Sequence, residues 1–172
     1  MNFQFYVEKL QHLDDFNEFM KKNPDSYCCS GFFVIGLEEK KDNKIFEDKQ
    51  HFDFWLPKDK KIMSFQLEES KFVEVEVFDE NVPSEVNLYL SFDFDKIKEL
   101  ILEKMLERGI KNKLQKILLS LQEKNGNHYL MGTAFISMLG ILKINIDLDN
   151  MKITDFEKKS FFDIMKVRRK EK

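Results

Sequence analysis

Four segments in the middle of the chain alternate apolar and polar side chains with a period of two. These segments are 51–56, 62–68, 71–78 and 87–94. Because successive side chains of a β-strand point to opposite faces, this spacing predicts four strands that each bury one face. The short connections between the segments favour an antiparallel meander.

The alternation also assigns side chains to the two faces of the predicted sheet. The face expected to be buried carries an apolar side chain at every second position: Phe52, Phe54, Leu56, Met63, Phe65, Leu67, Val73, Val75, Val77, Leu88, Leu90, Phe92 and Phe94. The opposite face mixes polar and aromatic side chains: His51, Asp53, Trp55, Ser64, Gln66, Phe72, Glu74, Glu76, Phe78, Tyr89 and Ser91. Aromatic rings among a few polar groups are typical of partner interfaces and ligand grooves.

We therefore expect a ligand or partner face on this second side of the sheet. The residues expected to form it are Trp55, Gln66, Phe72, Phe78 and Tyr89. The alternative is that the terminal strands or the first helix cover this side and make it a second layer of the core. An error of one residue in the register of a strand would also move its side chains to the other face.

Helical periodicity appears in two other segments. Apolar side chains recur every three or four residues over 95–124, which predicts a long helix that Gly109 kinks or divides. A short helix is predicted over 14–22, and Pro24 follows its end. The aromatic segment 3–7 is predicted to be a short strand or arm.

The remaining apolar segments are rich in aromatic and β-branched residues, which indicates further strands. We predict strands over 27–37, 128–149 and 151–156, an exposed loop over 38–49 and a short helix near 161–165. The strand 27–37 is expected to be buried on both faces. The segment 128–149 is expected to break near Gly140, although 134–142 also fits a short helix.

Strands followed by a helix and then by further strands give an α+β fold. We expect a single domain over 1–172, in which an antiparallel β-sheet packs on one long α-helix, with a short N-terminal helix. A chain of 172 residues is long enough to bury a core without disulfides or a bound metal. Its 18 Phe residues predict a core rich in aromatic rings.

The charge balance and the apolar runs restrict the classes of partner. The chain has 28 basic and 31 acidic side chains, and this net charge of −3 disfavours nucleic acid as a partner. The first residues lack the basic region and the apolar run of a secretory signal. The longest uncharged stretch, 129–142, is shorter than the roughly 20 residues that span a bilayer. We therefore expect a cytoplasmic protein that does not enter a membrane.

No spacing typical of a phosphate-binding loop, a nucleophile elbow or a metal site occurs, so we predict no cofactor and no metal. Cys28 and Cys29 are adjacent, and we expect two small buried apolar side chains rather than a disulfide framework. His51 is the best catalytic candidate of the three histidines because it shares a strand face with Asp53. Glu74 supplies a further carboxylate for acid–base chemistry.

The absence of a catalytic constellation and the excess of Phe favour a non-enzymatic module over an enzyme. We expect it to bind a protein or a small ligand through the aromatic-bearing sheet face, with a homodimer as one form of that interaction. The alternative is a small hydrolase or transferase centred on His51 and Asp53. A third hypothesis, nucleic-acid binding by the basic tail 166–172 and exposed aromatic rings, is opposed by the net acidity.

Overall fold

The computed structural model describes residues 1–37, 49–76 and 81–160, and these form an α+β fold with one large antiparallel sheet. Eight strands lie in the order β4-β3-β2-β1-β5-β6-β7-β8. The elements are α1 (Phe3–Gln11), α2 (Asp14–Lys22), β1 (Tyr27–Gly36), β2 (Gln50–Leu56), β3 (Lys61–Gln66), β4 (Lys71–Val75), α3 (Phe94–Glu107), β5 (Leu114–Lys124), β6 (Asn127–Ile136), β7 (Gly140–Asp147) and β8 (Lys152–Ser160).

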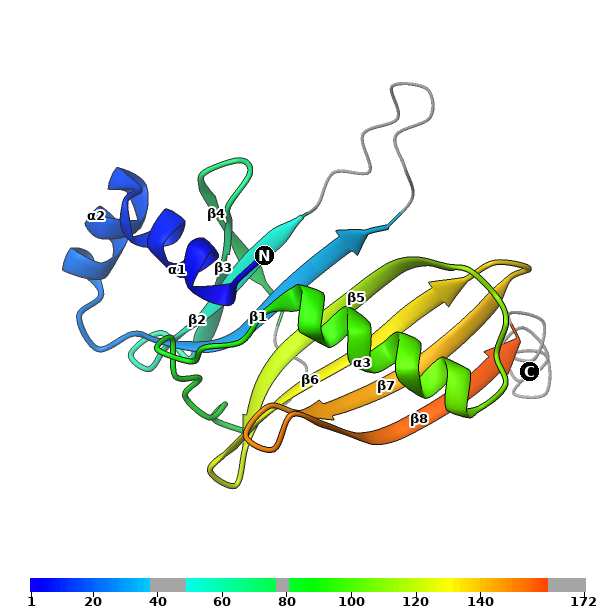
Figure 1. The fold of residues 1–172 in the computed structure, drawn as a ribbon. Helices are drawn as coiled ribbons and strands as arrows, with labels where there is room; N and C mark the ends of the chain where they lie inside the picture. Colours follow the sequence, from blue (N-terminus) through cyan, green and yellow to red (C-terminus); the bar gives the residue numbers. More distant parts are fainter. Residues whose placement is uncertain (38–48, 77–80, 161–172) are drawn as a thin grey trace, which may run out of the picture.

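The sheet consists of two meanders of four strands that lie side by side. β1–β4 form the first meander and β5–β8 the second, and the pairing of β1 with β5 joins them. All three described helices lie on one face of this sheet, with α1 and α2 over the first meander and α3 over the second (Figure 1). We call this side the helix face and the other side the opposite face. Of the long helix expected over 95–124, only the first part forms a helix, namely α3.

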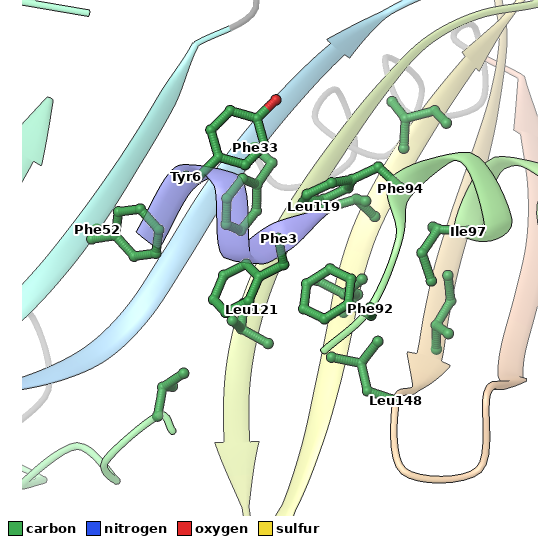
Figure 2. Close-up of a cluster of buried hydrophobic side chains, with 14 of the residues drawn as sticks. Phe3, Tyr6, Phe33, Phe52, Phe92, Phe94, Ile97, Leu119, Leu121 and Leu148 are labelled. Carbon is green, nitrogen blue, oxygen red and sulfur yellow. The ribbon is translucent and has the colours of Figure 1, made fainter. Parts of the chain in front are cut away.

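The core between the helices and the sheet is built largely of aromatic rings, as the Phe content predicts. Phe3 of α1 and Phe94 of α3 both contact Phe33 of β1, with ring centroids 5.9 Å and 5.0 Å away (Figure 2). Leu119 of β5 belongs to the same buried cluster. The core therefore crosses the seam between the two meanders, so the structure describes one continuous hydrophobic core.

The segment predicted as a strand over 3–7 is instead the helix α1, and that prediction is wrong. Four of its residues are buried, namely Phe3, Tyr6, Val7 and Leu10. Their spacing of three and four residues is that of one face of a helix, although aromatic and β-branched residues also favour strands. Asn2 accepts a hydrogen bond from the Gln4 N–H and caps the helix.

The predicted long helix over 95–124 is divided into α3 and β5. α3 ends at Glu107 with Arg108 as its C-cap, and Gly109 follows in the left-handed region at φ +67°. The N–H of Ile110 then bonds to the Met105 carbonyl (2.8 Å), a geometry that closes a helix. In β5 the buried side chains alternate, because apolar residues there fit a period of two as well as a helical period.

Residues 87–94 were expected to form a strand, and they do not. Within the described residues their one bridge joins Asp93 to Asn2. The side-chain amide of Gln4 donates instead to the Leu88 carbonyl (2.8 Å), so α1 supplies a hydrogen bond that a neighbouring strand would otherwise supply. The alternating apolar side chains reflect packing against the core rather than membership of the sheet.

The register of β4 differs by one residue from the expected one. Phe72 lies on the helix face, paired with Phe65 and stacked on Phe19 of α2 with ring centroids 3.9 Å apart. Val73 and Val75 point the other way and are 42% and 39% exposed. A phenyl ring buries more apolar area than a valine, which favours the register that packs Phe72 against the helix.

The other predicted elements are confirmed with small shifts at their ends. β1, β2 and β3 follow the expected strands, α2 has the expected bounds, and β8 is longer than expected. The segment 128–149 forms β6 and β7, so the alternative of a helix over 134–142 is wrong. The predicted helix near 161–165, the basic tail and all but the last residue of the loop 38–49 lie outside the described residues.

Candidate functional site

The five residues expected to form a partner face do not share one surface. Trp55 and Gln66 lie on the opposite face, where their strands place them. Phe72 points to the helices, as described above, and Phe78 lies outside the described residues. Tyr89 is 85% exposed and lies in a turn rather than in a strand. The aromatic sheet face is therefore smaller than expected.

The catalytic candidates His51 and Asp53 do come together on the opposite face. His51 Nε2 lies 3.7 Å from Asp53 Oδ1, and the imidazole ring stacks on Phe32 with centroids 5.0 Å apart. Ser30 donates its hydroxyl to the other carboxylate oxygen of Asp53. Glu74 is not part of this group, because it lies on the helix face of β4 and pairs with the Lys61 ammonium.

The order of these groups determines what they can do. In a nucleophilic relay the imidazole lies between the hydroxyl and the carboxylate, so that it can take the hydroxyl proton. Here the Asp53 carboxylate contacts both the Ser30 hydroxyl and the His51 imidazole. The arrangement holds Asp53 in place and does not activate Ser30.

A second candidate site lies on the helix face, at the end of the seam between the meanders. β1 pairs with β5 only from Gly31 onward, and a bulge between Cys28 and Ser30 precedes that point. The strands diverge beyond it, and the segment that leads toward α3 lies in the gap (Figure 1). The N–H of Val86 donates to the Cys28 carbonyl (2.8 Å). This bond gives a partner to a carbonyl of β1 that lies beyond the pairing with β5.

This divergence leaves a hollow of about 690 Å³, which we call the end cleft. Its lining comes from α1, α2, β1, β2, the segment 85–89 and the hairpin of β5 and β6. The lining residues are Gln11, Phe16, Met20, Ser26, Tyr27, Cys28, Phe54, Glu85, Val86, Asn87, Leu88, Tyr89, Glu123, Gly126 and His128. The most deeply buried of these side chains, those of Phe16, Cys28, Phe54 and Val86, are apolar. The cleft thus has an apolar floor and a polar rim.

Hydrogen bonds from several elements fix the segment 85–89 across the cleft. The N–H of Asn87 donates to His128 Nε2 (3.4 Å), and the Asn87 side chain accepts from the Tyr89 N–H (2.8 Å). The His128 N–H in turn donates to Asp149 Oδ2 (3.1 Å). Together with the contact between Gln4 and Leu88, these bonds hold the cleft wall between α1 and the second meander.

The charged groups of the lining are carboxylates. Hydrogen bonds from the Ser84 hydroxyl and the Gly126 N–H hold the pKa of Glu123 below its usual range, so this group stays ionised at neutral pH. Glu85 is exposed at the rim. Burial raises the pKa of the Tyr27 phenol, and neighbouring Cys29 and Glu85 add to that shift. No lysine or arginine occurs among the described residues that line the cleft.

The two adjacent cysteines are buried free thiols, as the sequence analysis expects. Burial raises the pKa of Cys28 well above its usual value and that of Cys29 to about 12. A thiol with so high a pKa is a poor nucleophile near neutral pH. Cys28 therefore serves the cleft as a part of its apolar floor.

Within the described residues, no group of three or more His, Cys, Asp or Glu side chains has the arrangement of a metal site. The cleft itself escaped the sequence analysis because its lining comes from six separate parts of the chain. Tyr89 lines the cleft, although the sequence predicts it on a strand that does not form. One local sequence feature does point to part of the cleft. The turn Asn125-Gly126 joins β5 to β6 and so places Glu123 and His128, two of the lining residues, opposite each other.

No protein-family model matches the chain, and no curated protein sequence is significantly similar to it. The fold is similar to a crystal structure from Clostridium difficile 630 of a protein described as a "putative lipoprotein". The match has a TM-score of 0.50 and 11% sequence identity, and it covers 85% of this chain and 91% of that one. At this identity the likeness concerns the fold alone. In the described part of this chain, none of the helices is long and apolar enough to cross a membrane.

Proposed function

We propose that this protein is a non-enzymatic binding module that holds a small ligand in the end cleft. The observation that carries the proposal is the form of the hollow, about 690 Å³ with an apolar floor and a polar rim. Sites for small molecules are typically concave, mostly apolar and roughly 300–1,000 Å³ in volume, with a few polar groups that orient the ligand.

The hydrogen bonds around the cleft support a site that is formed before the ligand arrives. The wall segment 85–89 is joined to Cys28 of β1, to His128 of β6 and to Gln4 of α1. A wall fixed by three elements loses little conformational entropy when a ligand binds. The proposal therefore needs no folding step on binding.

The other hypotheses from the sequence receive less support from the geometry. An enzyme centred on His51 and Asp53 would also use Glu74, which lies on the helix face away from them, and Ser30 contacts the Asp53 carboxylate rather than the imidazole. A protein partner on the opposite face would find little aromatic surface there, because Trp55 is only 6% exposed and Phe72 points to the helices. The homodimer and the cytoplasmic location remain predictions.

The proposal is tested with N-phenyl-1-naphthylamine, a neutral apolar dye whose fluorescence rises in an apolar site. Leu88 lines the cleft, whereas Leu106 is 81% exposed on α3 and lies outside it. We expect Leu88→Asp to weaken dye binding by about tenfold or more, because it replaces part of the apolar contact by a charge. Leu106→Asp is the matched control and should bind the dye as the unmodified protein does.

Urea midpoints of both variants show whether each protein is folded under the conditions of the binding experiment. The proposal fails if the unmodified protein does not bind the dye up to its solubility limit. It also fails if Leu88→Asp and Leu106→Asp, both folded, bind the dye equally well. The first outcome would show that the cleft does not take up an apolar ligand, and the second would place the dye outside the cleft.

A further inference from the structure

The chemistry of the cleft rim indicates the class of ligand. Glu85 and Glu123 are the two acidic residues of the lining, and the described lining contains no lysine or arginine to balance them. The Ser84 hydroxyl and the Gly126 N–H keep Glu123 ionised. A charged group bound at this rim would therefore meet a negative potential.

Several backbone N–H groups of the wall are already engaged within the protein. An anionic ligand needs N–H or O–H donors, and three N–H groups of the wall are already used within the protein. They belong to Val86, Asn87 and Tyr89, which donate to the Cys28 carbonyl, to His128 and to the Asn87 side chain. The Tyr27 hydroxyl likewise donates to the Pro83 carbonyl (2.8 Å).

Aromatic rings form a large share of the lining and suit a cation as well as an apolar body. The lining includes Phe16, Tyr27, Phe54 and Tyr89. The face of an aromatic ring carries negative charge density and attracts ammonium groups, which is how quaternary ammonium ligands are commonly recognised. Carboxylates and aromatic faces are thus two separate features that favour a cation.

We propose that the end cleft binds an organic cation, an amine or quaternary ammonium group attached to an apolar body. Glu85 and Glu123 face the cationic group at the rim, and Phe16, Phe54 and Val86 contact the apolar body at the floor. This inference rests on the proposed function, since it specifies the ligand class of the same site. The inference adds that the cleft prefers cationic ligands to neutral or anionic ones, which the apolar floor alone does not require.

The test compares three octyl compounds below the concentrations at which they form micelles, with isothermal titration calorimetry. Octyltrimethylammonium is cationic, octyl glucoside is neutral and octanoate is anionic. We expect the cation to bind about tenfold or more tightly than the anion, with the neutral compound between them. Added sodium chloride should reduce the preference, because the rim carboxylates are partly solvated.

The charge preference is assigned to the rim with two double variants that change the net charge equally. Glu85→Gln with Glu123→Gln should weaken the cation about tenfold and leave octyl glucoside within about twofold. Glutamine keeps an oxygen that can accept from Gly126. Glu8→Gln with Glu18→Gln, on exposed positions of α1 and α2 outside the lining, should leave the affinity for the cation nearly unchanged.

The outcomes separate the inference from the proposed function. If none of the three compounds binds, the proposed function itself fails. If octyl glucoside binds and the cation binds no more tightly than octanoate, the cleft binds ligands and the inference is overturned. Equal loss of cation affinity in the two double variants would also overturn it, because the preference would then come from the overall charge.

Discussion

Phe3 is one of the four buried side chains of α1, and its removal is a direct test of the core. Phe3 is fully buried, and its ring stacks on Phe92 at a centroid distance of 4.7 Å. It also contacts Phe33 and Phe52, at 5.9 Å and 6.0 Å. Replacement by alanine removes contacts with β1, with β2 and with the segment that precedes α3.

The expected cost follows from these contacts. A buried Phe→Ala replacement lowers the free energy of unfolding by about 3–5 kcal/mol, as lost apolar transfer plus the cavity that remains. Phe3 should fall in the upper part of that range, because ring pairs contribute roughly 0.5–1.5 kcal/mol beyond buried area. In a domain of this size each kcal/mol lowers the midpoint of thermal unfolding by roughly 2–4 °C. We therefore expect a decrease of roughly 8–20 °C for Phe3→Ala.

The assay is urea unfolding followed by far-ultraviolet circular dichroism, with the thermal midpoint as a second measurement. Phe5→Ala is the control, because Phe5 belongs to the same helix and is 54% exposed. It should cost roughly 1 kcal/mol or less, since its one described ring contact is with Tyr6. Equal losses in the two variants would refute the assignment of Phe3 to the core and with it the docking of α1.

Two further predictions concern the cysteines and the sheet. Because burial raises the pKa of Cys28 and Cys29, the native protein should react with Ellman's reagent at about pH 8 far more slowly than the guanidinium-unfolded chain; equal rates would show accessible thiolates. Gly132→Ala should prevent stable folding, because the added carbon would lie 2.1 Å from the Leu118 carbonyl oxygen. Gly126→Ala, where φ is +83° and space is open, should cost only roughly 1–2 kcal/mol by urea unfolding.

The sequence predicts correctly those elements in which the spacing of apolar side chains fits only one secondary structure and one register. The strands β2 and β3 alternate cleanly and bury Phe52, Phe54 and Phe65 as expected. In β4 either register would bury apolar side chains, so only the contact of Phe72 with α2 decides between them. Such tertiary contacts are not visible in a local pattern.

Two errors have the same physical origin. In α1 the buried residues have helical spacing, but their aromatic and β-branched types also favour a strand. In β5 the run Ile117-Leu118-Leu119 fits a helix and a strand equally well. Gly109 was recognised as a break in the helix, and the sequence alone did not show that a strand would follow it.

The end cleft could not be predicted because it depends on how two distant strands pair. β1 and β5 pair only from Gly31 onward, and a bulge in the pairing of β1 with β2, between Cys28 and Ser30, lies just before that point. The N–H groups of the segment 85–89 then bond across the gap, which leaves the Glu85 and Glu123 carboxylates at the rim. The fold needs the seam but not these rim residues, so a protein can share the two meanders and differ in every group that would contact a ligand. A likeness at 11% identity therefore gives no information about the ligand, and the charge of the rim must be tested in this chain itself.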